Sequence, residues 1–164
     1  MKYKSRMKTE GYQGATFGVM EGVIMMLGVL IGLSMTGNKS IAILGVVTAG
    51  VADALANSSA FYVSEESEGI HTKKEVWKST WWAFAGTVIA VVCVLIPLLV
   101  FDLPNAIYAA FIVAVVLLIF LAMFVAKNLK LNLKKLVIKY VVMAVVVAIA
   151  TFVVSNLLLR VLVI

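Results

Sequence analysis

Four side chains inside otherwise apolar stretches are the residues of this sequence best suited to chemistry. Glu21 lies in the run GATFGVMEGVIMMLGVLIGLS, and Asp53 lies in the next apolar run. Met25 follows Glu21 by four residues and Asn57 follows Asp53 by four, so each pair shares one face of a helix. Burying a carboxylate in a membrane helix costs about 2.5–3.5 kcal/mol on insertion scales, so we interpret both acids as functional.

The depth of the two acids predicts that they lie close together. Glu21 is about eight residues from the start of its run and Asp53 about ten from the end of the next, so both sit roughly 12–16 Å deep. Two ionised carboxylates at close range repel each other in a low dielectric, so the site should hold a cation or a proton. Carboxylate and amide oxygens beside a thioether suit a divalent metal such as Fe²⁺ or Mn²⁺.

Structural roles explain the same residues without any transported ion. Glu21 could be a protonated acid that hydrogen-bonds to a neighbouring helix. Asp53 and Asn57 could form a polar clamp between helices, and Met25 could simply fill space in the core. These alternatives remain open at the level of the sequence.

A second acidic group lies in the polar segment 64–78 and comprises Glu65, Glu66, Glu68 and His71. These side chains could bind a metal ion weakly. The lysines of the same segment dilute the negative charge, so a solvated loop explains the pattern equally well.

Motifs typical of enzymes are missing from the sequence. It contains no phosphate-binding glycine loop, no nucleophile elbow and no zinc-ligand spacing, so we expect neither enzymatic activity nor a permanently bound cofactor. Cys93 is the single cysteine and has no partner in the chain for a disulfide.

Five apolar runs must position these residues. The chain of 164 residues is 63% hydrophobic, and each run is about as long as the ~20 residues that cross a bilayer. We therefore predict an all-α integral membrane protein whose residues 1–164 form a single transmembrane domain. The expected helices cover about 13–36, 40–63, 79–101, 105–126 and 139–161.

The distribution of lysine and arginine predicts the orientation. The N-terminal tail, the segment 64–78 and the segment 127–139 share one side and hold 12 of the 14 basic residues. By the positive-inside rule the N-terminus is cytoplasmic and the C-terminus external. We expect a multi-pass protein of the cell membrane. Its partner is the lipid bilayer, and we do not expect it to bind nucleic acid. The leucines of 127–139 align on one side and predict a stretch that lies in the interface.

Five glycines in the first helix predict close helix packing. Gly28 and Gly32 share a face with Glu21 and Met25, and spaced glycines let a second helix approach closely. We expect these positions to pack the helices and to support a homodimer. The set is Gly14, Gly18, Gly22, Gly28 and Gly32.

The first two helices resemble those of the vacuolar iron transporter family, which includes nodulin-like proteins. Glu21-Gly22 and Leu27-Gly28 match the acid-glycine and Leu-Gly elements of the family's first helix. Ala54-Leu55-Ala56-Asn57 and Tyr62-Val63-Ser64 match the end of its second helix in part. The specific motifs are confined to residues 14–68.

The resemblance implies a dimer of five-helix subunits whose first helices line the two-fold axis and the metal path. Glu21 corresponds to the acid of the family's transport site. Asn57 stands where the family has a methionine ligand, Phe61 where it usually has a glutamate, and Asp53 where it has a small residue. The family's glutamate-rich cytoplasmic domain between helices 2 and 3 is replaced here by residues 64–78.

These observations favour a transporter that exports Fe²⁺ or Mn²⁺ from the cytoplasm in exchange for protons. A structural membrane protein that transports nothing, and a transporter of another small solute, are the alternatives. Uptake of metal into liposomes separates the first from the others.

Overall fold

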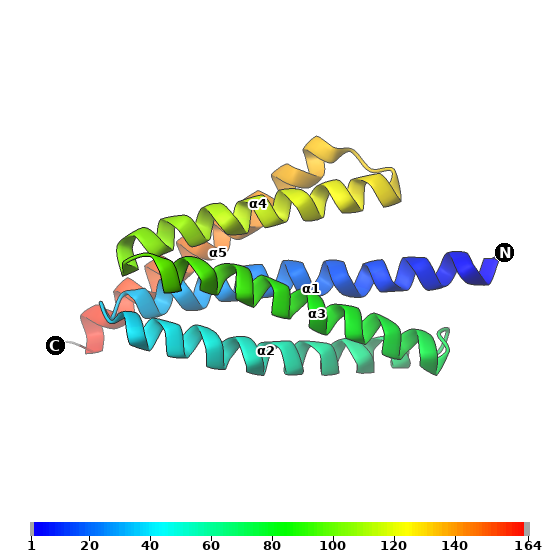
Figure 1. Ribbon diagram of the computed structural model, residues 1–164, viewed down its shortest axis with the longest axis horizontal. Coiled ribbons are helices and arrows are strands. Elements are labelled where there is room, and N and C mark those ends of the chain that lie inside the picture. The colour runs from blue at the N-terminus through cyan, green and yellow to red at the C-terminus, as the bar shows by residue number, and fades with distance from the viewer. Residues whose placement is uncertain (1, 163–164) are drawn as a thin grey trace.

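The computed structural model shows a bundle of five α-helices (Figure 1). It describes the backbone of residues 2–162 and the side chains of residues 11–161, so the basic side chains of the N-terminal tail lie outside the described part. Within the described residues there is no strand, which confirms the predicted all-α class. The helices are α1 (Lys2–Ser34), α2 (Lys39–Ser67), α3 (Lys73–Val100), α4 (Leu103–Leu129) and α5 (Leu133–Leu162).

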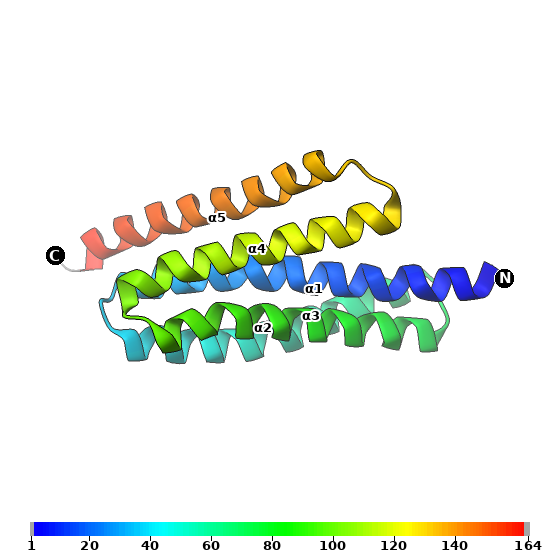
Figure 2. The same ribbon diagram turned by 45° about the horizontal axis from the view of Figure 1, so that its top comes forward.

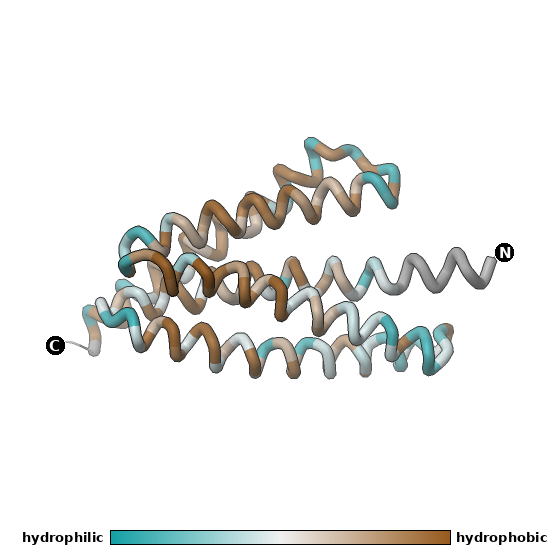
Figure 3. The backbone as a smooth tube through the Cα atoms, viewed as in Figure 1, coloured by the Kyte–Doolittle hydropathy of each residue, from teal (hydrophilic) through white to brown (hydrophobic). Residues whose placement is uncertain are grey.

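All five helices are long and apolar enough to cross a membrane. Figures 1 and 2 show the two termini at opposite ends of the bundle. The α2–α3 and α4–α5 turns lie at the end that holds the N-terminus, which we call the basic end. Figure 3 shows hydrophilic residues gathered at the two ends and hydrophobic residues along the middle. This distribution is typical of a protein that spans a bilayer.

The predicted helix boundaries were too narrow at the basic end. The helices α1, α3 and α5 each begin six or more residues before the apolar runs that marked them, at Lys2, Lys73 and Leu133. Polar residues continue a helix into the headgroup region because its backbone hydrogen bonds are satisfied internally. The predicted loop 64–78 is therefore only the short turn 68–72.

The segment 127–139, for which the sequence predicted an interfacial stretch, does not form a separate element. Helix α4 ends at Leu129, Lys130 adopts a left-handed conformation with φ of 53°, and α5 starts at Leu133. A single turn thus joins two long helices, and the aligned leucines belong to their ends.

Side-chain caps fix the short turns. The Asn38 carboxamide oxygen accepts hydrogen bonds from the backbone N–H groups of Ser40 and Ile41, at 2.9 and 3.2 Å, and so starts α2. Thr72 and Glu75 form a reciprocal capping box at the start of α3. These caps satisfy backbone donors that helix starts leave unpaired.

Helix α1 is the centre of the bundle and packs against all four other helices. Its large apolar side chains Met26, Leu27 and Leu30 are fully buried. The helix α5 is the least buried of the five and covers α1 and α4 from one side.

The five predicted packing glycines of α1 are divided between two neighbouring helices. A Cβ atom at Gly14 or Gly18 would collide with backbone carbonyls of α3, and one at Gly22 would lie 2.9 Å from the Ala90 Cβ. Gly28 and Gly32 instead face α5. The glycines divide in this way because α1 lies at the centre of the bundle. Helix α3 packs along its N-terminal half and α5 along its C-terminal half. All five glycines therefore pack helices within one chain.

Candidate functional site

The interface of α1 and α2 brings together the two intramembrane acids. Asp53 is 6% exposed, and its Oδ1 accepts a hydrogen bond from Asn57 Nδ2 at 2.7 Å. The carboxyl group of Glu21 lies within hydrogen-bonding reach of both residues. The predicted proximity of Glu21 and Asp53 is thereby confirmed, because the short α1–α2 turn places both acids at one level of adjacent helices.

Each of the two carboxyl groups has one oxygen without a protein partner. Glu21 Oε2 and Asp53 Oδ2 are buried and make no hydrogen bond. A buried acceptor without a donor costs free energy, and two charges in contact cost more. The arrangement can therefore accept a cation between the carboxyl groups, or a proton that one group shares with the other.

A groove of about 500 Å³ runs beside Glu21, between α1 and α5. Met25 lines it together with Glu21 and is 38% exposed. Two further thioethers line the same groove, Met20 and Met143. Met20 directly precedes Glu21 in the sequence, and this adjacency is the signal that could have indicated it. Met143 carries no sequence signal, because only the packing of α5 on α1 brings it near.

The acidic group at the basic end is partly assembled. His71 Nε2 lies 3.6 Å from Glu65 Oε2 and 3.3 Å from Glu68 Oε2. Gln13 Nε2 of α1 donates to Glu65 Oε1 at 3.0 Å, which ties α1 to the end of α2. Glu66 lies apart and accepts a hydrogen bond from the Tyr62 hydroxyl at 3.3 Å.

Among the described residues, no group of three or more His, Cys, Asp and Glu side chains is arranged to hold a metal ion. A metal at Glu21 and Asp53 would therefore need the Asn57 amide, a thioether, water or a second subunit to complete its coordination.

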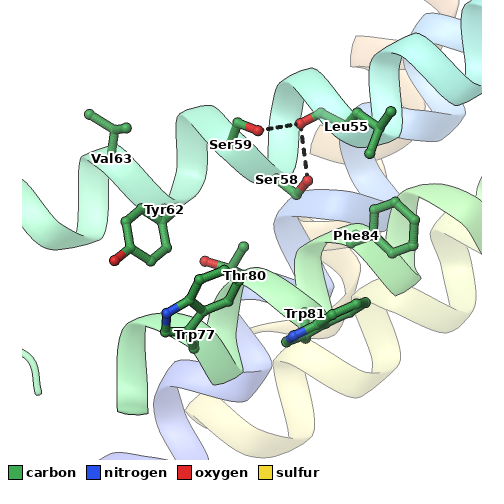
Figure 4. A pocket seen from close by; sticks show the side chains of 9 residues that line it. All are labelled: Leu55, Ser58, Ser59, Tyr62, Val63, Trp77, Thr80, Trp81 and Phe84. Atoms are coloured by element: carbon green, nitrogen blue, oxygen red, sulfur yellow. Dashed lines mark hydrogen bonds between the residues drawn. The ribbon is translucent and has the colours of Figure 1, made fainter. Parts of the chain in front are cut away.

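A second groove, of about 540 Å³, lies between α2 and α3 near the basic end (Figure 4). Its walls are mainly aromatic and aliphatic, with Trp77, Trp81 and Phe84 contributed by α3. Ser58 and Ser59 turn their hydroxyls back to the carbonyl oxygen of Leu55, at 3.1 and 2.8 Å. These polar groups are satisfied within their own helix, so the groove presents a surface suited to lipid.

No protein-family model, no curated protein and no solved structure matches the chain.

Proposed function

We propose that this protein is a secondary transporter that moves a divalent transition metal, Fe²⁺ or Mn²⁺, out of the cytoplasm in exchange for protons. The observation that carries the proposal is the contact of Glu21 with Asp53, in which each carboxyl group keeps one buried oxygen without a partner. The resemblance of residues 14–68 to vacuolar iron transporters supports the same assignment of Glu21.

The chemistry of exchange follows from the pair of acids. A metal bound between the carboxyl groups displaces their proton, and a proton on either group weakens an oxygen ligand. The site therefore holds metal or protons in alternation. Neutral cytoplasm favours loading of the metal, and an acidic far side favours its release.

A homodimer built around α1 would strengthen the site. Phe17 and Met25 remain 39% and 38% exposed on this central helix, on the side that carries Glu21. If this side faces its copy, two pairs of carboxyl groups converge near the two-fold axis. A disulfide between copies of Met25→Cys, in a Cys93→Ser background, tests this arrangement.

The direction of transport rests on the orientation of the chain. The basic end, which carries the α4–α5 turn, is assigned to the cytoplasm by the positive-inside rule. A cysteine placed at Lys130 should resist an impermeant thiol reagent in intact cells. Modification of this cysteine would reverse the assignment.

A structural role for the polar group is the second candidate. The Asn57–Asp53 hydrogen bond of 2.7 Å lies within one helix and is compatible with a polar clamp. Purified protein in liposomes separates the two readings. Uptake of Mn²⁺ that depends on protein and is driven by a proton gradient supports transport, and uptake no faster than that of empty liposomes contradicts it.

A further inference from the structure

The α1–α2 interface is layered between the basic end and the paired acids. Gln13, Phe17 and Glu21 follow one another at four-residue intervals, so they occupy successive turns of α1. Gln13 binds Glu65 at the outermost layer. In the middle layer the ring centroids of Phe17 and Phe61 lie 5.2 Å apart. An aromatic pair thus separates two polar layers.

Two grooves that border α1 on its α5 side meet at the level of Phe17. A groove of about 570 Å³ at the basic end lies between α1, α4 and α5, and Gln13, Asn128 and Lys139 supply its polar lining. The groove beside Glu21 continues in the same direction. Thr16 and Phe17 line both grooves, so they form the boundary between them.

The two phenylalanines differ in their freedom to move. Phe61 is 7% exposed, whereas Phe17 is 39% exposed. Phe17 lines both grooves and Phe61 lines neither, so a change of the Phe17 rotamer is the smallest change that would alter the boundary between the grooves. Side-chain rotation of this kind needs no movement of the helix backbone.

We propose that Phe17 is a gate on the route from the basic end to Glu21, and that Phe61 holds it closed. This inference rests on the proposed transport function and names the step that admits the cation. An apolar ring in the route excludes water and ions, so the paired acids are separated from the basic end in this conformation. The gate opens when Phe17 leaves its contact with Phe61.

A cysteine beyond the gate reports whether the route is open. Ile24 lines the groove beside Glu21, and Cys93→Ser removes the native thiol. In Ile24→Cys, a small cationic methanethiosulfonate added at the basic end should react slowly. Phe17→Ala should raise the modification rate about tenfold, because an aromatic contact is worth roughly that factor in an equilibrium. Phe61→Ala should raise it by a smaller factor.

A matched variant controls for the loss of an aromatic ring. Phe84→Ala removes the same ring from the groove between α2 and α3 and should leave the rate unchanged. An unchanged rate in Phe17→Ala, or an equal rise in Phe84→Ala, overturns the gate. Phe17→Trp, which keeps the route filled, should react no faster than the parent and guards against an effect of misfolding.

The labelling measurement is independent of transport, since the reagent needs access and no metal. If the labelling rate rises on removal of the Phe17 ring but the protein takes up no Mn²⁺, the gate is supported and the proposed function is contradicted. If the labelling rate does not depend on the Phe17 ring but proton-driven Mn²⁺ uptake is normal, the gate is contradicted and the proposed function is supported.

Discussion

Two grooves of similar volume on the same bundle differ in what their polar atoms do. In the groove between α2 and α3, the hydroxyls of Ser58 and Ser59 donate to the carbonyl of Leu55. In the groove between α1 and α5, Glu21 keeps a buried oxygen without a partner. Buried polar groups are normally hydrogen-bonded, so the unsatisfied oxygen of Glu21 distinguishes this groove from the other and supports the function proposed for it.

The difference has a physical cause in helix geometry. A serine hydroxyl can donate to the carbonyl oxygen four residues earlier, so a helix satisfies it without help. An ionised carboxylate only accepts, and the N–H groups of a helix interior are already used. An intramembrane carboxylate therefore needs a side-chain donor or a cation. Asp53 finds Asn57 one turn further along its own helix, and Glu21 lies near Asn57 and the second acid.

Replacing Glu21 should have the largest effect on transport. Glu21→Gln keeps the shape and hydrogen bonding of the side chain but removes its titratable charge, so we expect proton-driven Mn²⁺ uptake to fall by at least about 100-fold. Ser59→Ala in the other groove is the control and should transport normally. Full, pH-dependent flux through a well-folded Glu21→Gln protein would be incompatible with the proposed mechanism.

Replacing Asp53 should weaken metal binding while leaving part of the site. We expect Asp53→Asn to reduce Mn²⁺ affinity by about 10- to 100-fold, since one charged ligand is lost and its hydrogen bond with Asn57 can be retained. Asn57→Ala and Met25→Ala should have smaller effects. Equilibrium binding of Mn²⁺ to detergent-solubilised protein measures all three. An Asp53→Asn protein with unaltered affinity would leave Glu21 as the only acid involved.

The proximity of the two acids could be predicted from the sequence because it follows from local rules. Glu21 and Asp53 stand out against apolar surroundings, and a short turn fixes the relative depth of consecutive helices. The five spans follow from the length of the apolar runs, and the structure confirms them. The exact ends of the helices could not be predicted from the apolar runs, because polar residues such as Lys73 and Lys74 continue a helix beyond the hydrocarbon.

Contacts between distant segments were beyond sequence reasoning. Nothing in the sequence indicates that Gly18 packs on α3 while Gly32 faces α5, since a helix pattern gives the direction of a residue and not its neighbour. For the same reason, the sequence indicates neither the position of Met143 in the groove beside Glu21 nor the contact of Phe17 with Phe61. Each depends on how helices cross, which is set by packing of the whole bundle.

The glycines of α1 offer a test of how tightly each half of this helix is held. Gly18→Ala places a Cβ against the backbone carbonyl of Ala83 in α3, and we expect a loss of about 1–3 kcal/mol in stability. At Gly32→Ala the nearest atom is Ser155 Oγ at 3.4 Å, so the change should be near neutral. Thermal unfolding in detergent compares the two. Equal melting temperatures would show that α1 and α3 separate easily.

The groove between α2 and α3 should show the smallest effect. Trp81→Ala widens this lipid-facing surface without touching Glu21 or Asp53, so Mn²⁺ flux should change less than about twofold, as is usual for surface positions. Initial uptake rates in liposomes provide the measurement. A loss comparable to that of Glu21→Gln would mean that the wrong groove has been assigned to transport.

Metal binding by the two acids should release protons, and this release can be counted. Calorimetric titration of the purified protein with Mn²⁺, in buffers of different ionisation enthalpy, counts the protons that leave as the metal binds. We expect about one proton per metal at neutral pH for the native chain, and a smaller release for Glu21→Gln and for Asp53→Asn. Binding of Mn²⁺ without any proton release, or a release that neither substitution changes, would contradict a site in which these two acids exchange metal for protons.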